Sequence, residues 1–107
     1  MADAGRVSPI VADAPDRQRY EAVLDGALAG ILEYKIKQGR LALIHTEVPP
    51  AFEGHGIAAA ITRFALDDAR SRGLRVVAIC PYVRRYLESH PEDLDIVVVP
   101  PVSSNTD

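Results

Sequence analysis

The chain has 107 residues, with 12 Lys and Arg against 15 Asp and Glu, and its formal net charge is −3. This length provides one hydrophobic core, and the shares of apolar (48%) and charged (25%) residues are those of a globular domain rather than a disordered segment. The lack of a basic excess argues against a dedicated nucleic-acid binder, and no apolar run reaches the roughly 20 residues that span a bilayer.

Cysteine usage and the N-terminal sequence indicate the compartment and the ends of the domain. Cys80 is the only cysteine, so an internal disulfide is excluded, and no residue cluster has the spacing of zinc ligands. The N-terminal residues lack the charged and apolar regions of a secretory signal. We expect a cytoplasmic single domain over residues 7–100, without a metal, between flexible tails at 1–6 and 101–107.

The first half of the chain has the signals of antiparallel strands. Asp25-Gly26 and Gln38-Gly39 are two-residue hairpin turns between alternating segments, and Pro49-Pro50 ends the last segment. The pattern predicts a meander of three or four strands. We expect them at residues 7–12, 20–24, 27–37 and 41–48.

The second half changes to a helical period. Residues 57–72 carry an apolar stripe, and Gly73 stands where a helix ends. The stripe contains Ile57, Ile61, Phe64, Ala65 and Ala69. We expect Asp68 and Arg72 to pair on the exposed face of this helix.

The segments after the long helix complete the predicted fold. The continuous apolar run at 75–80 indicates a strand buried on both faces, and a helix between strands makes those strands parallel. A short helix at 82–89 follows Pro81, and 96–99 is a last extended segment. The fold class is therefore α+β (mixed α/β), an antiparallel meander that leads into a β-α-β crossover and a short C-terminal helix.

The local signal that bears most on function is the turn Glu53-Gly54-His55-Gly56-Ile57-Ala58 between a strand and a helix. No Ser, Thr, Asp or Asn caps this helix, so its first N–H groups lack an acceptor, and the glycines let a ligand approach the backbone. Such a turn suits a phosphate. The alternative is a turn that only redirects the chain after Pro49-Pro50.

Two nucleotide-binding motifs compare poorly with this turn. Gly54, Gly56 and Ala59 match G-x-G-x-x-A, the dinucleotide fingerprint, but antiparallel strands precede them and the next strand ends without an acid. A Walker A loop is excluded because no Gly-Lys-Ser/Thr occurs.

With its flanks, the segment HTEVPPAFEGHGIAAAI resembles motif A, Q/R-x-x-G-x-G/A, of the Gcn5-related N-acetyltransferases. His45-Thr46-Glu47-Val48, the glycine turn and Cys80-x-Tyr82 together are similar to its small acetyltransferase-like subfamily, over about residues 28–92. The resemblance implies a minimal form of that fold. It also implies that the turn amides bind the pyrophosphate of coenzyme A and that the preceding strand pairs with the pantetheine arm.

Expected coenzyme-binding positions are carried over from this resemblance, and one residue departs from the family pattern. Glu53 stands where the superfamily usually has Gln or Arg, and its carboxylate would repel a pyrophosphate. The expected coenzyme-binding residues are Glu47, Val48, Gly54, His55, Gly56, Ile57 and Ala58.

The resemblance also points to His45 and Cys80 as catalytic residues. Strand alternation places Leu41, Leu43, His45 and Glu47 on one side of their strand, and we expect His45 and Cys80 to face one site at the strand ends. His45 can act as a general base, with a hydrogen-bonded sheet histidine as the alternative. Cys80 can be an acid, a transient acyl acceptor or a packing residue.

These observations predict an enzyme that moves an acetyl group from acetyl-coenzyme A to an amine acceptor, either a small molecule or a protein. The alternative is a module that binds coenzyme A or acetyl-coenzyme A with little or no turnover, since so short a chain has few elements for an acceptor pocket. A plain interaction domain is a third possibility. No metal, nucleic acid or membrane partner is expected.

Overall fold

The structure, a computed structural model, describes residues 8–98. Its first four strands form the antiparallel meander that the sequence predicts. Asp25 (φ 56°), Gly26 (φ 81°), Gln38 (φ 54°) and Gly39 (φ 77°) have the left-handed backbone that two-residue hairpins require. The strands are β1 (Ile10–Ala14), β2 (Arg19–Leu24), β3 (Ala27–Lys37) and β4 (Arg40–Glu47), with a short 3-10 turn η1 (Pro15–Arg17) between β1 and β2.

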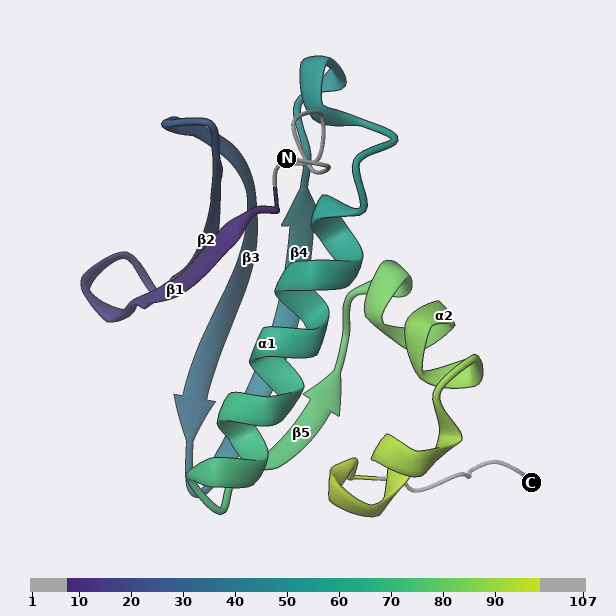
Figure 1. Ribbon diagram of the computed structural model, residues 1–107. Helices are drawn as coiled ribbons and strands as arrows, with labels where there is room; N and C mark the ends of the chain where they lie inside the picture. Colours follow the sequence, from purple (N-terminus) through teal and green to yellow (C-terminus); the bar gives the residue numbers. More distant parts are fainter. Residues whose placement is uncertain (1–7, 99–107) are drawn as a thin grey trace.

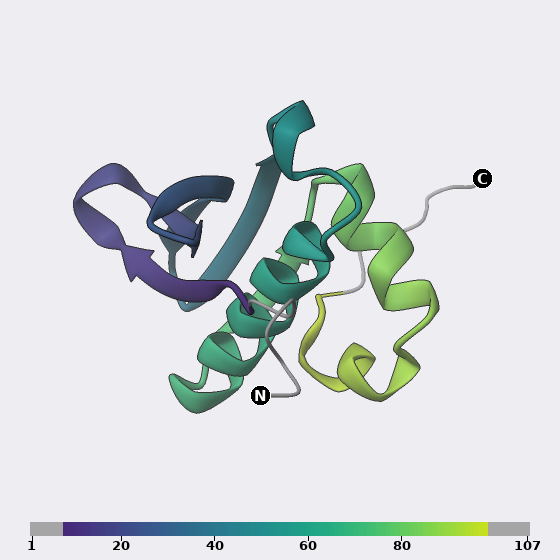
Figure 2. The same cartoon turned by 45° about the horizontal axis from the view of Figure 1, so that its top comes forward.

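The remaining elements form the predicted crossover. A 3-10 turn, η2 (Pro50–Phe52), leads into helix α1 (Ile57–Ser71), and β5 (Arg75–Ala78) then pairs in parallel with β4. Helix α2 (Pro81–Glu88) and the 3-10 segment η3 (Pro91–Ile96) follow. The five strands lie in the order β1-β2-β3-β4-β5, with α1 across one face and α2 next to α1 (Figures 1 and 2). The mixed α/β fold is confirmed.

The core lies between α1 and the sheet. Gly30 on β3 allows the close contact, because a Cβ atom there would lie 2.7 Å from a side-chain methyl of Ile57. The fully buried side chains come from both layers, and the largest are Tyr20, Leu32, Leu41, Leu43, Ile57, Ile61, Leu66 and Val76. The opposite face of the sheet carries exposed side chains such as Glu33, Lys35 and His45. Among residues 8–98, no helix is long and apolar enough to cross a bilayer.

Two expectations about burial are wrong. The strand at 75–80 ends at Ala78, and it is not buried on both faces, since Val77 is half-buried and Ile79 is 46% exposed. The reason is its place at the edge of the sheet, where α1 covers only the face of Val76. On α1 the expected stripe is shifted, because Phe64 is only half-buried while Thr62 and Leu66 are buried.

Other boundaries move by a few residues. The first strand begins at Ile10 rather than at residue 7, which lies outside the described residues. The expected extended segment at 96–99 is reduced to one isolated parallel bridge between Val76 and Val97. Residue 99 and the expected tails at 1–6 and 101–107 also lie outside the described part of the chain.

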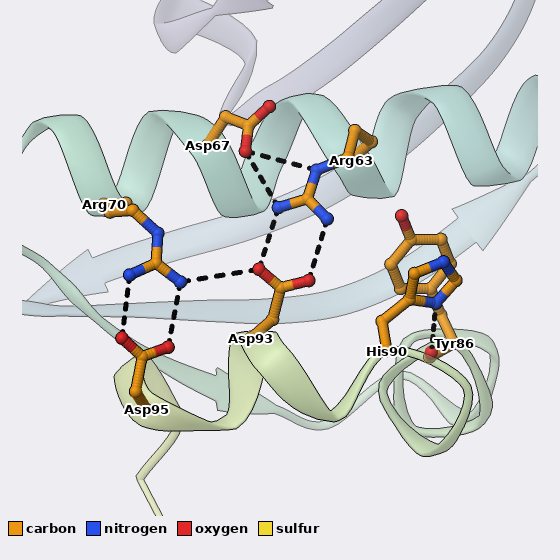
Figure 3. Close-up of polar contacts among 7 residues, drawn as sticks. All are labelled: Arg63, Asp67, Arg70, Tyr86, His90, Asp93 and Asp95. Atoms are coloured by element: carbon orange, nitrogen blue, oxygen red, sulfur yellow. Dashed lines mark hydrogen bonds and ion pairs between the residues drawn. The ribbon is translucent and has the colours of Figure 1, made fainter.

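Ion pairs hold η3 against α1 (Figure 3). The buried carboxylate of Asp93 accepts two hydrogen bonds from Arg63, at 2.8 and 2.9 Å, and one from Arg70 at 3.4 Å. Arg70 also binds Asp95 through two bonds of 2.8 Å. The hydrogen bonds from Arg63 lower the pKa of Asp93 below its ordinary value, and those from Arg70 lower the pKa of Asp95. On the same helix, the expected pair of Asp68 and Arg72 is present at 2.9 Å.

Candidate active site

The glycine turn leaves the first turn of α1 without a cap. Gly56 is the N-cap residue and provides no side-chain bond, while Gly54 (φ 85°) and Gly56 (φ 73°) both have left-handed backbone. A Cβ atom added to either glycine would meet nothing within 4 Å, so the backbone here borders open space. The sequence prediction of an uncapped helix start is confirmed.

The backbone amides of this turn are free for a ligand. Within residues 8–98, no backbone acceptor is bonded to the N–H groups from Gly54 to Ala59, and the first bonded amide is that of Ala60, which reaches the carbonyl of Gly56 at 3.0 Å. These donors lie at the positive end of a 15-residue helix. The arrangement fits an anion with several acceptor oxygens, such as a phosphate or pyrophosphate.

A hollow of about 190 Å³ lies beside these amides, and a second of about 490 Å³ adjoins it. Ala59 and Tyr82 line both hollows, so together they form a groove between the start of α1 and one side of α2. Burial raises the pKa of Tyr82, which keeps its hydroxyl protonated as a hydrogen-bond donor. At the far end of the groove Tyr86 and His90 stack, with ring centroids 3.9 Å apart (Figure 3). The groove offers room for a long ligand that begins at the turn.

The strands that flank the turn separate just before it. The parallel ladder of β4 and β5 ends at Leu43 and Ala78, and the amides of Ile79 and Cys80 both donate to the carbonyl of Leu43, at 3.0 and 2.9 Å. Residues 44–47 of β4 continue past this point and, in the described structure, form no pairs with β5. Figure 1 shows β4 extending beyond the end of β5. The divergence leaves one edge of β4 open next to the turn.

A bulge in β4 changes the face on which the last residues of this strand lie. Glu33 and Tyr34, consecutive on β3, pair with His45 and Leu43, so Ile44 has no partner across the ladder. Because paired residues share a face and consecutive residues alternate, Leu43 and His45 lie on opposite faces. The expectation that His45 and Glu47 share the face of Leu41 and Leu43 is therefore wrong.

The bulge turns Thr46, rather than His45, toward Cys80. The Thr46 hydroxyl lies 3.2 Å from the sulfur of Cys80, which is 3% exposed and is the N-cap residue of α2. His45 is on the other face, where its Nε2 lies 3.2 Å from a carboxylate oxygen of Glu47 and both side chains are more than half exposed. His45 and Cys80 therefore belong to opposite faces of the sheet at the place where the strands diverge.

The structure gathers five of the seven expected coenzyme-binding residues at the hollow beside the turn, namely Val48, Gly54, Gly56, Ile57 and Ala58. Glu47 instead lines a hollow of about 150 Å³ next to Ile31 and Pro49. The side chain of His55 is exposed and does not line the hollow. Only the backbone N–H of His55, which has no backbone acceptor within residues 8–98, could bind the coenzyme. Glu53 does line the hollow, and no cation among residues 8–98 lies within 4.0 Å of its carboxylate.

From the sequence we expected no role at this site for Thr46, Phe52 or Ala59, and Tyr82 was named only as part of the motif Cys80-x-Tyr82. Tyr82 stands two residues after Cys80 in the first turn of a helix, which was a usable signal. Thr46 could be placed only with the bulge known.

Comparisons with known proteins show which family and which solved structures the chain is similar to. The family model of the GCN5-related N-acetyl-transferases matches residues 19–96. Protein NATD1 of Mus musculus is 35% identical over 80 residues, which cover 71% of this chain and 73% of its own length. Protein NATD1 of Homo sapiens is 32% identical over 77 residues, covering 70% and 68%.

Solved structures share the fold. A GCN5-like protein of Staphylococcus aureus superposes with a TM-score of 0.66 at 14% identity, over 92% of this chain and 96% of its own. A GNAT acetyltransferase of Brucella melitensis, solved with acetyl-CoA, has a TM-score of 0.51 at 26% identity, over 64% of this chain and 50% of its own.

Proposed function

Because the chain belongs to the GCN5-related N-acetyltransferase family, we propose that it transfers the acetyl group of acetyl-coenzyme A to an amine, with the coenzyme held at the glycine turn. The observation that carries the proposal is the run of amides from Gly54 to Ala59 beside the hollow at α1, none of which is bonded to a backbone acceptor within residues 8–98. The pyrophosphate would accept hydrogen bonds from these amides. The adenosine end would follow the groove past Tyr82, and the pantetheine arm would follow the open edge of β4.

In this proposal, the two substrates approach from opposite faces of the sheet. The coenzyme groove, Thr46 and Cys80 lie on the helix side, whereas His45 and Glu47 lie on the exposed side. An amine can therefore approach the thioester carbonyl from the exposed face while the coenzyme stays on the helix side. This placement supports a role for His45 beside the acceptor amine and a role for Cys80 beside the thioester.

Each step of the transfer has a candidate group. The amine nitrogen attacks the thioester carbonyl, a C–N bond forms, and the C–S bond of the tetrahedral intermediate then breaks to release the coenzyme thiolate. His45 takes the proton that the amine loses. With Nε2–H donating to Glu47, its Nδ1 is the free acceptor, so Glu47 positions the base. Cys80 supplies the proton that the leaving thiolate gains.

Rates of coenzyme A release with a panel of primary amines test this function. His45→Ala and Cys80→Ala should each lower the rate about 100-fold, the scale of general acid–base groups, with little change in coenzyme affinity. Intact-mass measurement after acetyl-coenzyme A is added, without an amine, separates the alternatives for Cys80. If the wild-type chain becomes acetylated, Cys80 acts as a covalent acetyl acceptor rather than as a proton donor.

A coenzyme-binding module with little turnover is the second candidate. The observation in its favour is the small size of the hollow on the acceptor side, about 150 Å³. Tight binding of acetyl-coenzyme A without transfer to any amine of the panel would support the module over the enzyme.

A further inference from the structure

A largely aliphatic cavity of about 490 Å³ lies between β5, α2 and η3, outside the coenzyme groove. It shares no lining residue with the hollow at the glycine turn, and it shares only Glu88 with the second hollow of the groove. The cavity lies on a different side of α2 from Tyr82 and Tyr86, which line the groove. Its apolar lining consists of Val77, Ala78, Leu87, Leu94, Val97 and Val98. A lining of this kind, without aromatic rings, matches the surface of an alkyl chain, and the volume is within the range of small-molecule sites.

The charged residues of the cavity favour an alkyl ligand that ends in an anionic group. Arg40, Arg84 and Glu88 complete the lining, and all three are exposed. The Nε of Arg84 donates to the carbonyl of Ala78 at 3.0 Å, which fixes the guanidinium over the end of β5. Among residues 8–98, neither Arg40 nor Arg84 has a carboxylate within 4.0 Å. Their terminal N–H groups are thus available to a ligand from outside.

The surface around the cavity is also positively charged. A neighbouring hollow of about 260 Å³ shares Arg40 and Val77 with the cavity and adds Lys35 and Lys37. Among residues 8–98, the lining of these two hollows therefore contains four cations and one carboxylate, that of Glu88, although the whole sequence carries a net charge of −3. Such a local excess attracts anions and disfavours cations.

We propose that this cavity binds a medium-chain carboxylate, with the alkyl chain on the aliphatic lining and the carboxylate on Arg84 and Arg40. The guanidinium matches a carboxylate through two parallel hydrogen bonds, which an ammonium head group would not accept. Burial of the alkyl chain against the aliphatic lining adds affinity, and a short acid such as acetate has no alkyl chain to bury.

Calorimetric titration of the full chain with sodium decanoate, below its micelle concentration, tests the site. Decanoate should bind, whereas acetate, which lacks the chain, and decylamine, which carries the opposite charge, should bind at least about tenfold more weakly. Arg84→Gln should weaken decanoate binding about tenfold. Arg85→Gln is the matched control, because Arg85 is the next exposed residue of α2 and lines the coenzyme groove instead.

A second variant tests the aliphatic lining without endangering the fold. Leu94 is 50% exposed, so Leu94→Glu should leave the circular dichroism spectrum unchanged and weaken decanoate about tenfold. Equal binding of decanoate and acetate, or unchanged affinity in Arg84→Gln, would overturn the proposal. Tighter binding of decyl phosphate than of decanoate would overturn the carboxylate assignment. Displacement of decanoate by coenzyme A would place the anion in the coenzyme groove and would also overturn it.

Discussion

The hydroxyl of Thr46 lies 3.2 Å from the sulfur of Cys80, although 34 positions separate the two residues. The contact joins the end of β4 to the N-cap residue of α2 at the point where β4 and β5 diverge. It orients the one thiol of the chain on the face of the sheet that α1 covers.

Thr46→Val removes this hydrogen bond and keeps the β-branched shape. If Cys80 protonates the leaving thiolate, the variant should transfer acetyl groups several-fold more slowly, and Thr46→Ser should restore the rate. A neutral hydrogen bond contributes about 1 kcal/mol, so the change in unfolding free energy should be no larger. Steady-state kinetics with chemical denaturation check both parts, and a Thr46→Val variant at full rate would remove the role given to the contact.

The sequence predicts that Glu47 binds the coenzyme, and its contact with His45 supports a different role, which is to position the histidine. Glu47→Ala should lower the transfer rate about tenfold, less than the loss of a base itself, while coenzyme affinity stays the same. Glu33→Ala is the control, since Glu33 pairs with His45 across the ladder and is exposed on the same face. Weaker coenzyme binding by Glu47→Ala would instead show that Glu47 contributes to the coenzyme site.

Glu53 should reduce coenzyme affinity, because its carboxylate lines the hollow beside the turn without a described cation partner. Repulsion from a pyrophosphate at such a partly solvated position is on the order of 1 kcal/mol. Glu53→Gln should therefore tighten coenzyme A binding several-fold, and Glu53→Arg more. The gain should shrink at high salt. Titrations at two salt concentrations check this, and equal affinities would show that the carboxylate turns away from the ligand.

Asp93 should stabilise the domain by holding η3 on α1. Asp93→Ala removes the two hydrogen bonds that Arg63 donates to the buried carboxylate of Asp93, and it should cost about 2–3 kcal/mol of unfolding free energy. Asp67→Ala is the control, because Asp67 binds the same arginine with a side chain that is 64% exposed, and it should cost less than about 1 kcal/mol.

The contribution of Asp93 should also depend on pH. Its pKa in the folded chain lies below the ordinary value, so the stabilisation is complete above the unfolded pKa of about 3.9. It is lost as the pH falls below that value toward the folded pKa. The difference between wild type and Asp93→Ala in denaturation curves should thus be constant near neutrality and shrink below about pH 4. A difference that persists unchanged in acid would contradict the ionic contribution.

Much of the fold follows from local sequence signals. Asp25-Gly26, Gln38-Gly39 and Gly73 all adopt the left-handed backbone that their positions predict, and α1 begins at Ile57 directly after the glycine turn. The resemblance carried by that turn is confirmed by the family match over residues 19–96. These features depend on short-range backbone chemistry, which the residue types determine.

The errors come from relations between strands. Leu43-Ile44-His45 contains neither Gly nor Pro, so the bulge at Ile44 leaves no mark in the sequence and simple alternation puts His45 on the wrong face. The run after Arg75 has the residue types of a central strand, yet β5 lies at the sheet edge. Its exposure depends on which element covers it, and that information is in the tertiary structure alone.

Calorimetric titration of coenzyme A into the Gly56→Asp variant tests whether the glycine turn binds the pyrophosphate. Gly39→Asp is the matched control, since Gly39 has the same left-handed backbone (φ 77° against 73°) and open surroundings but lies in the β3–β4 hairpin. We predict that wild type and Gly39→Asp bind coenzyme A alike and that Gly56→Asp, folded by circular dichroism, does not bind it. Wild-type affinity in Gly56→Asp would contradict the assignment of the turn as the pyrophosphate site.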